Sequence, residues 1–360
     1  MYQFIDDKNY KHLIGIIVGG SENEKNIHGL AHVGEHMLLL PCFEEDDKDE
    51  SYSTFGYTCI DHIFLYFTSQ KERTLEIVKN KIEDKSIIRA DRVEIAKHQV
   101  ICECENLKDQ IASNEEKVRF ITDNRITNFA AGNVEDIKAI TEKNIGEWLD
   151  GIINEKRMFF FSLEEYSYAS LQNVCVKRNL NQCISKQLET VQSLYMNRQK
   201  QNSYKVEIYV PLSLVCEKEK CFWQLLDEYY IKNYLSKFTK QIDVSEKFFS
   251  YTERYLLISI ENALPDLIPK IVGELRNSSD WGKDISYKDE KEKFYYQLMM
   301  AQDNRVSSNM DIINAVIKEL IFNIPFIDID KDIDLLKSVG NYLSAEIQES
   351  LKKSIKIVIS

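Results

Sequence analysis

Glycine and proline are scarce in this 360-residue sequence, which contains only 12 and 5 of them. Ordinary proteins use about 7% glycine and 5% proline, so we expect few turns and long helices and strands. No apolar run approaches the ~18 residues of a membrane-spanning helix, and we predict no membrane span. A basic excess is also lacking, because 46 basic against 58 acidic residues leave a net charge of −12. That balance argues against a nucleic-acid binder, which needs a basic surface for phosphates.

An export signal is missing as well. Residues 1–13, MYQFIDDKNYKHL, carry acidic residues where a signal peptide has a basic end followed by an apolar core. We therefore expect a cytoplasmic protein whose eight cysteines remain thiols in a reducing environment. The cysteine spacing forms no paired CxxC sets, which disfavours a structural zinc knuckle.

What the sequence does contain is enough apolar residues, 44%, to fill real cores, which excludes wholesale disorder. Strands and helices alternate in mixed order, and this order predicts an α+β fold. The segment 52–69 is rich in aromatic and β-branched residues and indicates either a strand pair or one long bent strand. The other expected elements of the first half are a buried strand at 12–19, a strand at 157–163 and helices at 31–40, 70–84, 91–111 and 135–150.

The same order of elements begins again in the second half. Residues 205–212 indicate a strand, 221–238 a helix and 248–261 further strands, followed by helices. Between the halves, MNRQKQNS is polar and has no periodicity. We therefore predict two similar domains, residues 1–195 and 205–360, joined by a linker at 196–204.

The clearest chemical feature is HVGEH at residues 32–36. On a helix, side chains at i and i+4 lie on one face about 5–6 Å apart, so His32 and His36 can reach one ion. A catalytic zinc ion binds such nitrogens and keeps one position open for water. Glu35 lies at the edge of the same face and can accept a proton from that water without binding the metal. The alternative is a helix whose histidines are merely packed or exposed.

Two imidazoles leave zinc under-coordinated, so a third protein ligand is required. The expected helix at 91–111 offers Glu103 and Glu105. Val100 and Leu107 bracket Glu103 at i−3 and i+4, which favours an inward position for Glu103. Glu105 points about 160° away, at 100° per residue. We predict Glu103 as the ligand and keep Glu105 as the alternative.

These residues resemble the pitrilysin-type zinc metallopeptidases, the inverzincins with an HxxEH motif. GSENEKNIHGLAHVGEHMLLLP at 20–41 resembles the family signature, a glycine-serine turn with an acid followed by Gly-x-Ala-His-x-x-Glu-His-Met and an apolar run. STFGYTCIDHIFLYF at 53–67 resembles the family's next strand, and GNVEDIKAITEKNIGEWLD at 132–150 resembles a later helix entry. The resemblance covers about residues 10–165, and the second half resembles the family by pattern only.

The resemblance implies two similar α+β domains, each a mainly antiparallel sheet of about six strands flanked by helices. It implies a zinc endopeptidase that acts on short unfolded peptides inside a chamber of four such domains. This chain supplies two of them, so a second subunit of the same type is needed. At the positions that match the family's motif, the resemblance implies one Zn²⁺ per chain, bound by His32, His36 and Glu103. It implies that Glu35 is the general base.

The family also binds peptide as an added strand at a sheet edge, where main-chain hydrogen bonds provide affinity. The corresponding edge residues here are Thr54, Phe55, Gly56, Tyr57 and Thr58. The pair at 55–56 replaces the family's Asn-Ala, which normally clamps the substrate backbone.

Two further departures concern a helix and a partner. Gly34 stands in the middle of the expected motif helix, at a cost of about 1 kcal/mol. In the second half, LSKFTKQIDVSEKFFSY at 235–251 contains Tyr251 but lacks the arginine with which the family grips peptide. We therefore predict a heterodimer, with a homodimer as the alternative.

Small bacterial relatives suggest leader or precursor peptides of modified-peptide bacteriocins as substrates. The competing hypothesis is a non-catalytic structural or peptide-binding subunit.

Overall fold

The computed structural model describes the residues 9–24, 27–43, 49–162, 191–196, 203–212, 218–278, 289, 291–296, 309–322, 324–325, 334–335, 344–352 and 355–360. Residues 197–202 of the expected linker at 196–204 therefore lie outside the described part. The described residues fall into two compact units, which take in 1–115, 126–177 and 307–321, and 116–125, 178–306 and 322–360, respectively.

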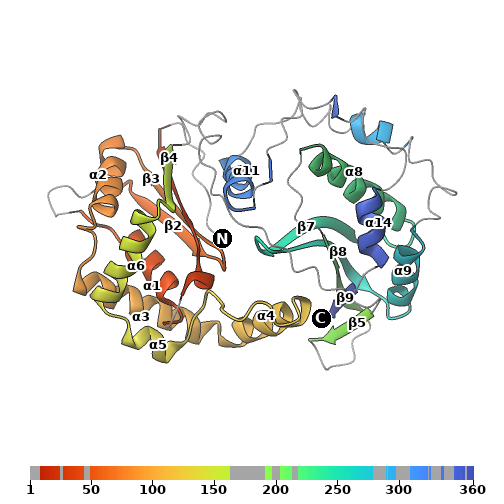
Figure 1. Ribbon diagram of the computed structural model, residues 1–360, viewed down its shortest axis with the longest axis horizontal. Helices are drawn as coiled ribbons and strands as arrows, with labels where there is room; N and C mark the ends of the chain where they lie inside the picture. Colours follow the sequence, from red (N-terminus) through yellow and green to blue (C-terminus); the bar gives the residue numbers. More distant parts are fainter. Residues whose placement is uncertain are drawn as a thin grey trace. The chain divides into compact units, whose positions relative to one another are not determined.

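An antiparallel sheet forms the centre of the first unit (Figure 1). Its strand order is β2-β3-β1-β4, and every neighbouring pair is antiparallel. The central strand β1 is buried along nearly its whole length, as expected for a strand with a neighbour on each side. The segment 52–69 is a strand pair. The strands are β1 (Lys11–Val18), β2 (Ser53–Thr58), β3 (His62–Ser69) and β4 (Met158–Ser162).

Helices of the first unit cover one face of this sheet, and their apolar residues form a single core with it. The short 3-10 helix η1 (Ser21–Asn23) precedes them. These helices are α1 (Leu30–Leu39), α2 (Glu72–Glu83), α3 (Ala90–Asn106), α5 (Val134–Ala139) and α6 (Glu142–Asn154). Helix α4 (Lys108–Ile121) follows α3, and its residues 116–121 belong to the second unit. The shared core includes Leu13, Ile17, Val33, Met37, Leu65, Phe67, Val78, Val93, Val100, Ile145 and Leu149.

Two expected helices are each divided in the structure. The helix expected at 91–111 ends at Asn106, and α4 begins at Lys108. The helix expected at 135–150 is divided into α5 and α6 by a capping box, in which Thr141 and Asn144 satisfy each other's backbone N–H groups. Such a reciprocal cap starts a new helix where periodicity alone predicts a continuous one.

The second unit also consists of a sheet with helices on one face (Figure 1). Its strand order is β5-β9-β6-β8-β7, and only the β5–β9 pair is parallel. The strands are β5 (Val191–Tyr195), β6 (Tyr204–Pro211), β7 (Ile242–Ser250), β8 (Glu253–Ala263) and β9 (Ile355–Ile359). The further helices of this unit are α8 (Lys218–Leu235), α9 (Leu267–Arg276) and α14 (Ala345–Lys352). Helix α11 (Asn309–Phe322) belongs, up to residue 321, to the first unit. Two antiparallel-rich sheets flanked by helices confirm the predicted α+β class.

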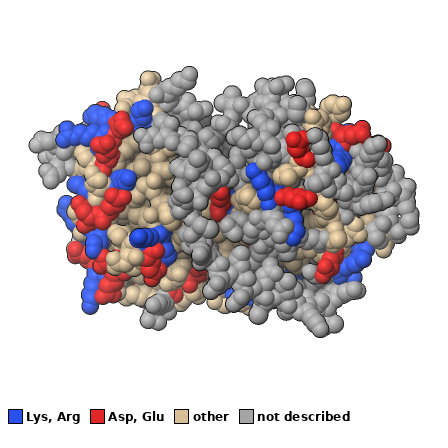
Figure 2. Space-filling view, turned by 45° about the horizontal axis from the view of Figure 1, so that its top comes forward, with Lys and Arg blue, Asp and Glu red and all other residues tan. Residues whose placement is uncertain are grey.

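On the face drawn in Figure 2, the acidic and basic side chains of the described residues are interspersed rather than gathered by sign. Within the described part of the chain, no helix is both long enough and apolar enough to cross a bilayer.

Candidate metal centre

Helix α1 carries the central motif, and groups from outside the helix define both of its ends. It begins after Gly29, whose φ of 95° is in the left-handed region that favours glycine. Gly29 provides no side-chain cap, and the buried Glu24 carboxylate caps the helix instead. It accepts hydrogen bonds from the backbone N–H groups of Gly29 at 2.9 Å and Ala31 at 2.8 Å. Burial raises the pKa of Glu24 to about 7, although these two bonds oppose the shift.

The two histidines of α1 converge on one carboxylate of α3. The Nε2 atoms of His32 and His36 lie 3.7 Å and 3.3 Å from the same Oε2 atom of Glu103. The two ring centroids are 5.0 Å apart. Two ligand atoms at about 2.0–2.1 Å from a tetrahedral zinc ion are separated by about 3.3 Å, and both separations from Glu103 are close to this value. Burial lowers the pKa of His36, which favours the neutral imidazole that a metal requires.

Of the two acidic candidates on α3, Glu103 is the one that meets the histidines. Its hydrogen bond with His32 lowers the pKa of its carboxyl group. Glu105 is exposed, and no ion pair joins it to either histidine in the described structure. One argument for Glu103 is wrong in detail, because Leu107 lies beyond the end of α3 and is 40% exposed instead of packed inward.

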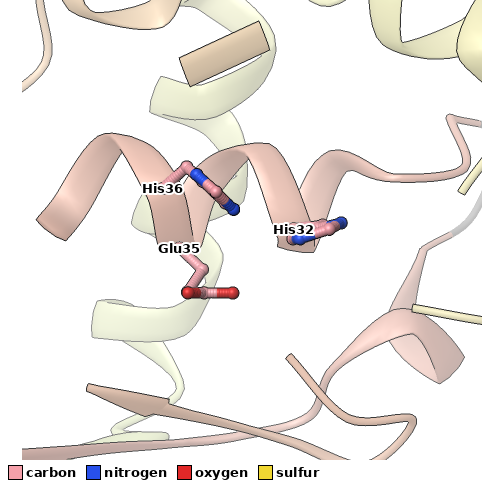
Figure 3. A group of neighbouring side chains, drawn as sticks. All are labelled: His32, Glu35 and His36. Atoms are coloured by element: carbon pink, nitrogen blue, oxygen red, sulfur yellow. The ribbon is translucent and has the colours of Figure 1, made fainter. Parts of the chain in front are cut away.

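Glu35 lies on the side of α1 that faces strand β2. Figure 3 shows it with His32 and His36 on successive turns of α1, and one donor atom from each of the three lies within 4.8 Å of the others. The Thr58 hydroxyl donates a 2.8 Å hydrogen bond to Oε2 of Glu35. Burial raises the pKa of Glu35 to about 7, while the charge of His32 opposes the shift. The carboxylate is therefore oriented and largely removed from water.

Gly56 allows strand β2 to approach this carboxylate. A Cβ atom at position 56 would lie 2.8 Å from Oε1 of Glu35 and 2.7 Å from a methyl group of Leu39. Real Cβ atoms essentially never come so close to backbone or packed side chains. Glycine at position 56 thus allows the close packing of β2 against α1.

Strand β2 is an edge strand, and in the described structure it pairs only with β3. The rings of Phe55 and Tyr57 pack near Phe64 of β3, with centroids 6.2 Å and 5.1 Å away. Because side chains alternate along a strand, these rings lie on the opposite face from Gly56 and Thr58. All five expected edge residues line one pocket of about 730 Å³ together with His32, Glu35, His36 and Glu103; its apolar lining includes Leu39, Leu40, Leu107 and Ile111.

Sequence reasoning missed two residues that support the centre. The Oε1 atom of Gln99, on α3, lies 3.2 Å from Nδ1 of His36. The imidazole donates this hydrogen bond, and its Nε2 atom is directed at Glu103. Gln99 precedes Glu103 by four residues, a helical spacing that could have indicated it. Trp148 of α6 lies against Gly34, and a Cβ atom there would be 2.5 Å from ring atom Cη2. No sequence spacing could have indicated Trp148.

Comparisons with known proteins identify the fold. No protein-family model matches the sequence, and neither does any curated protein. Among solved structures, the first half of the periplasmic protease PqqL from Escherichia coli matches with a TM-score of 0.73 and 14% identity, over 98% of this chain and 87% of that one. An M16-like peptidase from Alicyclobacillus acidocaldarius matches with a TM-score of 0.61 and 16% identity, over 98% and 93% of the two chains.

The ferredoxin protease FusC, in complex with Arabidopsis ferredoxin, matches with a TM-score of 0.67 and 11% identity over 98% of this chain. The chain spans 45% of the length of FusC and 45% of PqqL. At these identities the likeness shows the fold alone, which is that of half of an M16-like, pitrilysin-family peptidase.

Proposed function

We propose that this chain is the metal-binding subunit of a zinc endopeptidase that cleaves short unfolded peptides. One observation carries the proposal: the Nε2 atoms of His32 and His36 meet the same Glu103 oxygen, 3.7 Å and 3.3 Å away. The likeness to protease folds supports it. So does the buried Glu35 carboxylate, which lines the same pocket.

In this proposal His32, His36 and Glu103 hold one zinc ion. The ion supplies Lewis acidity, which polarises the scissile carbonyl of a peptide. Glu35 acts as the general base that takes a proton from the attacking water and delivers it to the departing amine. Thr58 holds Oε2 of Glu35, so Oε1 is the atom that handles the proton.

The substrate is an extended peptide that pairs with strand β2. An edge strand presents unpaired N–H and C=O groups, and an added strand satisfies them without any requirement for a particular sequence. The pocket beside β2 offers apolar surface from Leu39, Leu40, Leu107 and Ile111. An unfolded peptide exposes the backbone groups that such pairing needs, so we propose unfolded peptides as the preferred substrates. Leader or precursor peptides of modified-peptide bacteriocins in the cytoplasm are our proposed biological substrates.

A second subunit of the same fold completes the chamber in this proposal. The chain spans 45% of the length of PqqL and FusC, so one copy matches only part of those folds. The nearest arginine after Tyr251 is Arg254, which is buried and pairs with Glu246. Because Arg254 is engaged within its own sheet, we propose that a different subunit grips the peptide, which makes the assembly a heterodimer.

The test combines metal analysis with peptide cleavage, with and without the protein encoded beside this one. We expect about one zinc per chain. Glu35→Gln should keep the zinc and lose cleavage, and His32→Ala should lose both, while Glu105→Gln should keep both. A wild-type chain that takes up no zinc would contradict the proposal. Zinc binding and peptide binding without cleavage, unchanged by Glu35→Gln, would instead favour a non-catalytic peptide-binding subunit.

A further inference from the structure

Arg92 connects the two helices that carry the candidate ligands. It lies in the first turn of α3 and is 7% exposed, although arginine is rarely buried without a partner. Its guanidinium donates three hydrogen bonds to backbone carbonyls at the end of α1. The acceptors are Met37 and Leu40, both at 2.8 Å from Nη2, and Pro41, at 2.5 Å from Nη1.

These carbonyls need an external donor. The last four C=O groups of a helix have no partner inside it. Proline at 41 cannot donate to them, because it has no N–H. A cation from another element therefore satisfies this end of α1 and complements the negative end of the helix dipole. The same cation joins α1 to α3.

Arg92 lies on the same face of α3 as the groups that meet the histidines. Gln99 follows it by seven residues and Glu103 by eleven, which are helical repeats of one face. Gln99 contacts His36, and Glu103 contacts His32 and His36. The polar contacts between α1 and α3 thus run along one stripe, about 16 Å long at 1.5 Å per residue.

We propose that Arg92 is a positioning residue that sets the register of α3 against α1 and so places Glu103 beside the two imidazoles. This inference rests on the proposed zinc site. The remaining contact between the helices is apolar, from residues such as Val33, Met37 and Val100, and apolar surfaces tolerate small shifts. In some proteins a buried polar group fixes the register between packed helices. Arg92 reaches the three carbonyls through two nitrogens of its planar fork, a geometry that the single nitrogen of a lysine does not reproduce.

The experiment measures zinc affinity by competition with a chromophoric chelator, on the full chain. Removal of second-layer partners of metal ligands typically costs about 10–100-fold in affinity, and we expect a loss of at least this lower size for Arg92→Met. Arg92→Lys should lose a smaller but measurable part. Arg89→Gln is the surface control at the residue that precedes α3, and it should leave the affinity unchanged because the Arg89 side chain is 67% exposed.

A second control separates positioning from general stability. Lys81 of α2 donates a 2.8 Å hydrogen bond to the carbonyl of Cys42, close to the same end of α1, but it does not join α1 to α3. Lys81→Met should lower the thermal stability of the metal-free protein and leave the zinc affinity unchanged. If Lys81→Met and Arg92→Met both lower the zinc affinity in proportion to lost stability, the inference is overturned.

A double variant tests whether Arg92 acts through Glu103. In a Glu103→Gln background, Arg92→Met should weaken zinc binding little further, because coupled residues are not additive. A full additional loss in that background would overturn the inference. If Arg92→Met cannot be recovered folded, Arg92→Lys decides, and unchanged affinity in that variant overturns it. A wild-type chain that binds no zinc would instead refute the proposed function itself.

Discussion

Substitution of Gly34 by alanine tests the packing of the motif helix. In an exposed helix interior, glycine is less favourable than alanine by about 0.8–1.0 kcal/mol, so Gly→Ala ordinarily stabilises. Position 34 differs because the new Cβ atom would lie 2.5 Å from Cη2 of Trp148. Either α1 or the indole ring of α6 must then move. We therefore expect Gly34→Ala to destabilise the first unit.

The chain offers a matched control for the size of this effect. Gly146 lies inside α6, and nothing within 4 Å would meet a Cβ atom there. Gly146→Ala should therefore stabilise by up to about 1 kcal/mol. Overpacking in a filled core costs about 1–3 kcal/mol. The helix-propensity gain is common to both substitutions, so the free energies of unfolding of the two variants should differ by about 1–3 kcal/mol.

The assay is urea unfolding followed by far-UV circular dichroism, with wild type and both variants compared in the transition of the first unit. Both sites lie in this unit, so a separate transition of the second unit does not affect the comparison. The reasoning would be refuted if Gly34→Ala proved as stable as Gly146→Ala. Trp148→Leu in the Gly34→Ala background should recover part of the difference, because the smaller side chain leaves room for the added methyl group.

Two more predictions concern metal binding and acid stability. Gln99→Leu should weaken zinc binding by about 10–100-fold, because His36 loses the acceptor that orients its ring. Competition with a chelator measures the affinity, and an unchanged affinity would contradict this prediction. Burial alone raises the pKa of Asp49, but hydrogen bonds from Ser51, Ser69 and Thr74 outweigh it and hold the pKa well below its usual range. A depressed pKa contributes stability above the unfolded value of about 3.9, and this contribution is lost as the pH falls below it. Asp49→Asn should therefore lower the melting temperature at pH 7 and lower it less at pH 3; an equal difference at both pH values would contradict this.

Local sequence signals determined much of this protein. The spacing of His32 and His36 places both on one face of a helix, whatever surrounds that helix. The glycine at 29 and the proline at 41 limit the same helix to within a residue or two. β-branched and aromatic runs predicted the buried strand β1 and, at 52–69, either a strand pair or one long bent strand. The mixed order of strands and helices predicted the α+β class, which the structure confirms.

Other features depend on which distant segments meet, and only the tertiary structure decided them. Helical phase favoured Glu103 over Glu105, but the contact with both histidines depends on how α3 lies against α1. Gly34 carries a propensity cost in the sequence, and its reason is an indole ring 114 positions away. Likewise, the contact of Arg92 with the end of α1 exists only because α1 and α3 pack together. Spacing within one element specifies the direction of a side chain, whereas its partner is specified only when separate elements pack together.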